Sequence, residues 1–246
     1  MDGKPQVEVF DDPAALADAA ALAIVHEAVA AVAARGRFLI ALAGGATPRE
    51  TYSRLARPPH DAAMPWRRTY AFFGDERWVP PDHPQSNFRM AHEALLSKVP
   101  IPPDQVFRMG CEGDDPEAAA AAYARTMAEV FGARRGEVPR FDLILLGMGI
   151  DGHTASLFPG SPALREVFRT VAAVHAAAAA IPQRLTLTFP VLNAAACVTF
   201  LVAGAEKARA VRSVLAEGAL LPAGLVRPQD GRLVWMLDRA AAARLG

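Results

Sequence analysis

A continuous apolar run that ends in a glycine-rich turn is the feature that most constrains the fold of this chain. Residues 143–146 are Leu, Ile, Leu and Leu, a pattern typical of a strand buried on both faces of a parallel sheet. The turn that follows, residues 147–152, contains three glycines, which allow main-chain conformations that other residues avoid. Asp151 and His153 lie in or directly after this turn. Because open α/β sheets bind ligands at the carboxyl ends of their strands, we predict that the chemistry takes place here.

Strand-like and helix-like stretches alternate along the chain. The strand-like runs are residues 7–10, 37–43, 69–73, 142–147, 185–189, 198–202 and 233–237. The helix-like stretches are residues 13–34, 48–55, 87–96, 116–130 and 206–215, with Asp12 and Ser86 as predicted N-caps. This alternation predicts an α/β fold with a doubly wound, mostly parallel, Rossmann-like sheet and helices on both faces. The chain has no internal repeat and no charge block at a boundary, so we expect one domain, residues 1–246.

The balanced charge argues against two classes of partner. The chain has 26 basic and 26 acidic residues, whereas general nucleic-acid and membrane-surface binders need a basic excess, so we expect neither partner. The first ten residues lack the pattern of a signal peptide, and the charge-free apolar runs are too short to span a bilayer. Cys111 and Cys197 have neither metal-ligand nor disulfide spacing, which fits a reducing compartment. We therefore expect a cytoplasmic protein, and the sequence leaves open whether it is a monomer or a small homo-oligomer.

A second strand-like run ends in a turn suited to binding a phosphate. Residues 38–52 begin as an apolar strand, turn at Gly44 and Gly45, and continue into a helix that we expect to open at Thr47. Glu50, three residues further on, predicts a capping box at this helix start. The first amides of a helix lack internal partners and carry a positive partial charge, so they can hold an anion. A tight turn without a ligand would show the same residues, and on this segment alone the two interpretations are equal.

Charged residues follow two further strand-like runs. Asp75, Glu76 and Arg77 come directly after one of them, and Lys207 follows another. Three adjacent charges usually form a solvated turn, and a lone lysine usually lies on the surface. A lysine at a helix start, however, opposes the helix dipole unless an anion lies nearby, and both positions lie at strand ends in this architecture. We therefore interpret both segments as candidate parts of a site.

Two other interpretations of the central turn are weaker. Residues 147–152 match the G-x-G-x-x-G string of dinucleotide-binding folds, but the acidic residue at the end of the next strand is missing, since Glu166 precedes that strand. Asp151 would also meet the pyrophosphate. Asp151 and His153 are two possible metal ligands, but the sequence offers no recognisable third one. We therefore expect neither a nicotinamide cofactor nor a metal.

Four motifs follow one another along nearly the whole chain. They are LAGGATP at residues 42–48, GDERWVPPDHPQSN at 74–87, GMGIDGHTASLFPGS at 147–161 and AGAEKA at 203–208. In this order they resemble the 6-phosphogluconolactonase family. The resemblance implies a fold shared with glucosamine-6-phosphate deaminase. It also implies hydrolysis of 6-phospho-D-glucono-1,5-lactone to 6-phosphogluconate, the second step of the oxidative pentose phosphate pathway, with no cofactor.

The residues of the central turn fit that reaction. Lactone hydrolysis needs an activated water, a stabilised oxyanion and a proton for the departing ring oxygen. Histidine is the side chain whose ordinary pKa lies near neutrality, so His153 can accept the proton of the water and return it to the leaving oxygen. Asp151 is close enough to orient the imidazole. The resemblance places Arg77 in the pocket, facing either the phosphate or the carbonyl oxygen.

The remaining candidates are expected to hold the substrate and its phosphate. These residues are Gly44, Gly45, Ala46, Thr47, Asp75 and Lys207. The family commonly has Ser where this chain has Ala46, so one hydroxyl is missing from the phosphate loop. We therefore expect the loop to act through its backbone amides and Thr47, together with the ammonium group of Lys207.

Two rival functions remain. Resemblance to glucosamine-6-phosphate deaminase would call for an Asp-Glu-Tyr-like motif and a glutamate soon after the histidine. Here Arg77 follows Asp75 and Glu76, and residues 154–159 contain no carboxylate, which argues against the deaminase. A non-catalytic sugar-phosphate sensor, related to the effector domains of transcription regulators, would carry a DNA-binding helix-turn-helix and a basic patch, and the chain has no spare segment for them.

Overall fold

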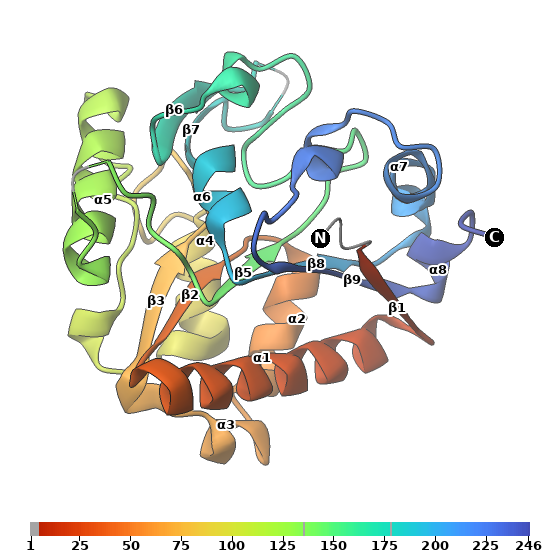
Figure 1. Ribbon diagram of the computed structural model, residues 1–246, viewed down its shortest axis with the longest axis horizontal. Coiled ribbons are helices and arrows are strands. Elements are labelled where there is room, and N and C mark those ends of the chain that lie inside the picture. Colours follow the sequence, from red (N-terminus) through yellow and green to blue (C-terminus); the bar gives the residue numbers. More distant parts are fainter. Residues whose placement is uncertain (1–4, 135, 178) are drawn as a thin grey trace.

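The chain folds around a six-stranded parallel sheet. The structure is a computed structural model that describes residues 5–134, 136–177 and 179–246 (Figure 1). The strand order is β1, β9, β8, β5, β2, β3, and all neighbouring pairs are parallel. The strands are β1 (Gln6–Phe10), β2 (Phe38–Leu42), β3 (Thr69–Phe73), β5 (Leu143–Leu146), β8 (Cys197–Val202) and β9 (Arg232–Asp238). The first four residues of the segment that was compared with a signal peptide lie outside the described residues.

Helices cover both faces of this sheet, which confirms the predicted doubly wound α/β fold. One face packs against α1 (Pro13–Arg35) and α2 (Ala46–Leu55) (Figure 1). The other packs against α5 (Pro116–Phe131), α6 (Phe189–Ala194), α7 (Ala208–Leu215) and α8 (Arg239–Ala242). Leu143 and Leu145 of β5 enter the core on the α1 side, and Ile144 and Leu146 enter the core on the opposite side. The strand is apolar throughout because neither of its faces meets water.

A second sheet, which the sequence did not predict, packs beside the first. It is antiparallel, with the order β4 (Asp75–Arg77), β7 (Gln183–Leu187), β6 (Val171–His175). The run predicted at residues 185–189 therefore belongs mostly to β7, and its last residue begins α6. Local pattern could not reveal β4, because its residues are Asp-Glu-Arg and only pairing with β7 makes them a strand. The alternative of a solvated turn is excluded for Asp75 and Glu76, because both side chains are buried.

Two of the predicted helix caps are confirmed and one is wrong. The amide of Ala15 donates to Asp12 at 2.8 Å, and the amide of Arg89 donates to Ser86 at 3.1 Å, at the starts of α1 and α4 (Asn87–Ala91). The capping box is absent, because α2 begins at Ala46 with Gly45 as its cap and no side chain caps it. Glu50 instead pairs with Arg54 one turn later, at 2.9 Å. The remaining short helices of the described chain are α3 (His60–Ala63), a π-helical turn over His92–Leu96 and five 3-10 turns.

Helix α1 is an exception to the expectation that no apolar run of this chain is long enough to span a bilayer. It has 23 residues and a mean hydropathy of 1.7 in its most apolar window, so by length and composition alone it could cross a membrane. In the fold it is a core helix, because Leu16, Ile24 and Val25 are buried against the sheet. Among the described residues it is the one helix that meets these two criteria.

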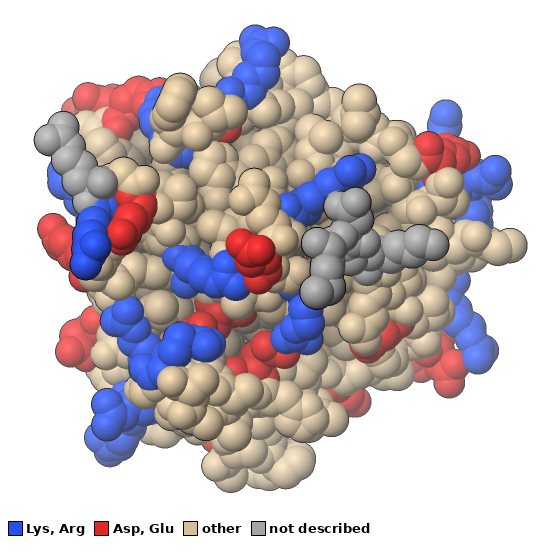
Figure 2. All heavy atoms as spheres, in the orientation of Figure 1, with Lys and Arg blue, Asp and Glu red and all other residues tan. Residues whose placement is uncertain are grey.

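The charged side chains are distributed over the surface. On the face shown in Figure 2, basic and acidic side chains are interspersed with uncharged surface between them. This mixture agrees with the zero formal net charge of the chain.

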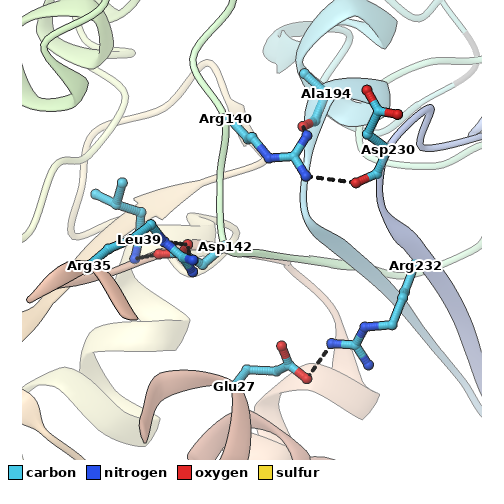
Figure 3. Close-up of polar contacts among 8 residues, drawn as sticks. All are labelled: Glu27, Arg35, Leu39, Arg140, Asp142, Ala194, Asp230 and Arg232. Atoms are coloured by element: carbon cyan, nitrogen blue, oxygen red, sulfur yellow. Dashed lines mark hydrogen bonds and ion pairs between the residues drawn. The ribbon is translucent and has the colours of Figure 1, made fainter. Parts of the chain in front are cut away.

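Polar contacts join the chain segments on the side of the sheet where the parallel strands begin (Figure 3). Asp142 is buried and accepts from the amide of Leu39 at 2.8 Å and from Arg35 at 2.5 Å. Arg140 donates to the carbonyl oxygens of Ala194 at 3.0 Å and Asp230 at 2.7 Å. These contacts join β2, the approach to β5 and the approach to β9, and so hold the strands in register.

Asp142 should therefore matter for stability. In Asp142→Ala the amide of Leu39 is left buried without an acceptor, and we expect the free energy of unfolding to fall by about 1 to 3 kcal/mol. Urea unfolding checks this value. Glu93→Ala, which breaks an exposed pair with Arg89, is the control and should change the free energy of unfolding by less than about 0.5 kcal/mol. Equal effects of the two substitutions would contradict the structural role of Asp142.

Candidate active site

A cleft of about 330 Å³ opens at the carboxyl ends of β2, β5 and β8. The second sheet closes one side of it, because β4 contributes Arg77 and β7 contributes Arg184. Eight of the nine predicted site residues line this cleft: Gly44, Gly45, Ala46, Thr47, Asp75, Arg77, His153 and Lys207. The ninth, Asp151, does not line the cleft but contacts His153. The topology brings these segments together because the carboxyl ends of parallel strands meet at one edge of the sheet.

Asp151 and His153 form a hydrogen-bonded pair at the end of β5. The Asp151 carboxylate lies 2.6 Å from Nδ1 of His153 and also accepts from the His153 amide at 3.2 Å. Burial raises the pKa of Asp151, but the hydrogen bonds and the charge attraction from His153 outweigh it and hold this pKa below its ordinary value. An ionised Asp151 can accept a hydrogen bond from Nδ1–H, and in that tautomer the lone pair of the imidazole is on Nε2. Because His153 lines the cleft, this tautomer would suit it to act as a general base there.

The turn around this pair is held by its own backbone and by one aromatic ring. The hydroxyl of Thr154 donates to the carbonyl oxygen of Gly147 at 2.8 Å, which closes the turn. The imidazole of His153 stacks on Phe158 with 4.3 Å between ring centroids. A Cβ on Gly149 would lie 2.1 Å from Nδ1 of His153, so only glycine leaves room for the ring. The glycine at position 149 thus makes room for the imidazole. The G-x-G-x-x-G string is followed by an irregular loop, not by the helix that a dinucleotide-binding motif would open.

The β2–α2 turn presents a helix start to the cleft. Gly45 has φ 108°, a conformation that favours glycine, and it turns the chain directly into α2. The hydroxyl of Tyr52, which is fully buried, accepts from the amide of Ala43 and donates to its carbonyl oxygen, both at 2.9 Å. This contact fixes the end of β2 against α2. The first amides of α2, at Ala46 and Thr47, have no partner inside the helix and lie at the cleft.

Lys207 approaches the same cleft from the end of β8. It ends a 3-10 turn (Ala205–Lys207) that leads into α7. The turn is anchored by Asp238, whose carboxylate accepts from the amide of Gly204 at 3.1 Å and caps α8 through Ala241. Lys207 therefore stands at a helix start, where its charge opposes the helix dipole.

The Asp-Glu pair of β4 holds together the wall of the cleft. Asp75 accepts from the hydroxyl of Ser156 at 2.6 Å and from the side-chain amide of Asn87 at 3.1 Å. Glu76 accepts from the amides of Asn87 and Phe88, at 2.7 and 2.8 Å. Burial raises the pKa of Glu76, although these hydrogen bonds counteract the rise. Glu76 thus anchors α4, whereas Asp75 reaches the cleft itself.

Sequence reasoning missed Arg184. It lies in β7 directly opposite Arg77 of β4, and both line the cleft. Its position ahead of the apolar run at residues 185–189 resembled an ordinary loop, and no local signal showed that β7 pairs with β4. Asn87, which was predicted only as part of a helix start, also lines the cleft.

The cleft is rich in unpaired positive charge. In the described chain, Arg77, Arg184 and Lys207 form no ion pair with a carboxylate. The described ranges hold no group of three or more His, Cys, Asp or Glu side chains that could bind a metal ion. The arrangement suits an anionic ligand placed against a histidine base.

Comparisons with known proteins agree with this geometry. The family described as glucosamine-6-phosphate isomerases/6-phosphogluconolactonase matches residues 11–235. The 6-phosphogluconolactonase of Synechocystis sp. is 42% identical over 98% of this chain and 98% of its own, and that of Streptomyces coelicolor is 40% identical over 100% and 96%. The structure of 6-phosphogluconolactonase from Trypanosoma cruzi superposes with a TM-score of 0.89 at 32% identity, covering 100% of this chain and 98% of that one. The chain belongs to the family of glucosamine-6-phosphate isomerases and 6-phosphogluconolactonases.

Proposed function

We propose that this protein is a 6-phosphogluconolactonase, which hydrolyses 6-phospho-D-glucono-1,5-lactone to 6-phospho-D-gluconate in the oxidative pentose phosphate pathway. The observation that carries the proposal is the Asp151–His153 pair, which faces a cleft containing three cationic side chains without carboxylate partners. The names of its relatives support the same activity. The enzyme is a cytoplasmic carboxylic ester hydrolase that uses no cofactor.

His153 acts as the base and then as the acid. Nε2 takes a proton from a water molecule while the water oxygen attacks C1 of the lactone, and the carbonyl π electrons move to the carbonyl oxygen. When the tetrahedral intermediate collapses, the bond between C1 and the ring oxygen breaks. The imidazolium then returns the proton to the ring oxygen, which becomes the C5 hydroxyl. One water is consumed, and the carboxylic acid that forms loses its proton to the solvent to give the carboxylate of the product. Asp151 keeps the imidazole in the required tautomer and stabilises its charged form.

The β2–α2 turn and Lys207 hold the phosphate. The amides of Gly44, Gly45, Ala46 and Thr47 and the Lys207 ammonium surround the anion and position C1 against His153. Because Ala46 has no hydroxyl, Thr47 supplies the side-chain donor of this loop. Arg77 lines both the cleft and an adjoining hollow beside Gly45 and Ala46, which favours the phosphate as its contact over the carbonyl oxygen. Asp75 keeps Ser156 and Asn87 in place at the substrate.

Lys207→Ala should act chiefly on substrate binding. The ammonium contacts the phosphate in the ground state and in the transition state alike, so we expect KM to rise about 10- to 100-fold with little change in kcat. Steady-state kinetics measure both constants. Lys98, the other lysine of the described chain, is exposed, and Lys98→Ala is the matched control. A fall in kcat at unchanged KM would contradict the phosphate role.

The function is tested by hydrolysis of freshly generated 6-phosphogluconolactone, with the spontaneous rate subtracted. A parallel reaction tests ammonia release from glucosamine 6-phosphate. Acceleration of lactone opening alone supports the proposal. Ammonia release would indicate the deaminase, even though no glutamate follows His153 in residues 154–159. Inactivity in both reactions, with retained binding of a sugar phosphate, would indicate the sensor.

A further inference from the structure

Arg184 is a cation that forms no direct ion pair with a carboxylate of the described chain, and the buried carboxylate of Asp75 lies one hydrogen bond further away, beyond Ser156. Its Nε donates to the carbonyl oxygen of Ile181 at 3.0 Å, one terminal nitrogen lies 3.4 Å from the Ser156 hydroxyl, and its guanidinium faces the ring of Phe158 at 5.4 Å. Partial burial lowers the pKa of Arg184. The side chain is thus held in place by neutral groups and is partly removed from water. A cation in this state is stabilised when an anion binds beside it.

Arg184 also stands directly opposite another arginine. Arg77 and Arg184 are register partners in the antiparallel pair β4–β7, and both line the cleft. Like charges placed opposite each other on neighbouring strands destabilise a sheet. Nε of Arg77 is moreover buried and meets no acceptor in the described part of the chain. Stability alone would not favour this arrangement, whereas a substrate that carries a phosphate and develops a second negative charge during the reaction would.

The two arginines have different surroundings within the cleft. Arg77 extends along the hollow beside the start of α2, where the phosphate amides are. Arg184 does not line that hollow. It packs on Phe158, the same ring on which the imidazole of His153 stacks. The shared contact with Phe158 places Arg184 near His153, at the end of the cleft where water is activated in the proposed mechanism. The hollow beside the start of α2 places Arg77 at the phosphate end.

We infer that Arg184 is a catalytic residue of the lactonase, which donates hydrogen bonds to the lactone carbonyl oxygen as that oxygen becomes negative. The inference deepens the proposed function and rests on it. Arg184 transfers no proton: it stabilises the oxygen that receives the carbonyl π electrons, and the negative charge leaves that oxygen when the bond to the ring oxygen breaks. The carboxylate of the product then occupies the same position. Because this charge exists fully only after attack, the interaction strengthens in the transition state.

The test compares kcat and KM of Arg184→Met with those of the wild-type enzyme. We expect kcat to fall about 100- to 1,000-fold, as for loss of an oxyanion donor, with KM changed less than about threefold. Arg125 is exposed on α5, and Arg125→Met is the matched control. A raised KM with kcat retained would assign Arg184 to ground-state binding and overturn the inference, as would an unchanged kcat. A wild-type protein that does not hydrolyse 6-phosphogluconolactone would instead contradict the proposed function itself.

A second measurement separates this role from a structural one. 6-Phosphogluconate carries both a phosphate and the C1 carboxylate, whereas glucitol 6-phosphate carries the phosphate alone. Arg184→Met should weaken competitive inhibition by 6-phosphogluconate and leave inhibition by glucitol 6-phosphate unchanged. Weakening of both inhibitors would overturn the assignment. Should Arg184→Met fail to fold, Arg184→Gln, which keeps planar N–H donors without the charge, is judged by the same two criteria.

Discussion

His153→Ala should lower kcat for 6-phosphogluconolactone about 100- to 10,000-fold, which corresponds to about 3 to 5 kcal/mol of barrier. Without the imidazole no group takes the proton from the attacking water, and none returns it to the ring oxygen. The phosphate site is untouched, so KM should change little. The spontaneous opening of the lactone sets the floor of the assay and must be subtracted from every rate.

His26 provides the control for this substitution. It is exposed on α1, remote from the cleft lining, and His26→Ala should leave both constants unchanged. The unfolding midpoint of each variant separates loss of the base from loss of the fold. Near-normal turnover by a folded His153→Ala enzyme would show that His153 is not the base and that the Asp151–His153 pair is not required for catalysis.

Gly149→Ala should reduce kcat about 100-fold although position 149 has no side chain to do chemistry. The added Cβ would lie 2.1 Å from Nδ1 of His153 and 2.5 Å from the Asp151 carboxylate, so the pair must move apart or the imidazole must turn. Displacement of a catalytic group by about 1 Å costs roughly that factor in rate. The effect should appear in kcat, since the phosphate contacts lie on other strands.

Gly110 is the matched control for this substitution. A Cβ there would meet nothing within 4 Å, and Gly110→Ala should leave turnover unchanged. The comparison measures how much of the rate depends on the geometry of the Asp151–His153 pair. Full activity of Gly149→Ala would show that the turn relaxes without loss and that the 2.6 Å contact is not required for catalysis.

Much of the candidate site could be predicted because it lies at strand ends. The apolar run at residues 143–146 predicted a strand buried on both faces. The residues that follow such a strand lie at the edge of the sheet where the other parallel strands also end. The same rule placed Gly44, Arg77 and Lys207 beside His153, although each lies in a different segment of the chain. Each of these predictions needed only the local pattern and the parallel topology.

The predictions failed where a partner distant in sequence decides the structure. One local prediction also failed: Thr47 and Glu50 were predicted to form a capping box, but the cap of α2 is Gly45, two residues before Thr47, and Glu50 pairs with Arg54. β4 was not predicted as a strand, because its three charged residues show no alternation of apolar residues. Its burial depends on β7, more than 100 residues away in sequence.

Local patterns in the sequence were enough to predict the parallel α/β core and the position of the Asp151–His153 turn, and to suggest anion binding at the β2–α2 and β8–α7 turns. These follow from hydrophobic periodicity, glycine positions and helix starts, which are properties of short segments. The tertiary structure was needed to show that Arg184 joins the cleft opposite Arg77 and that Phe158 contacts both its guanidinium and the imidazole of His153. This is because β4 and β7 are joined by long-range antiparallel hydrogen bonds, which no local pattern in either strand records.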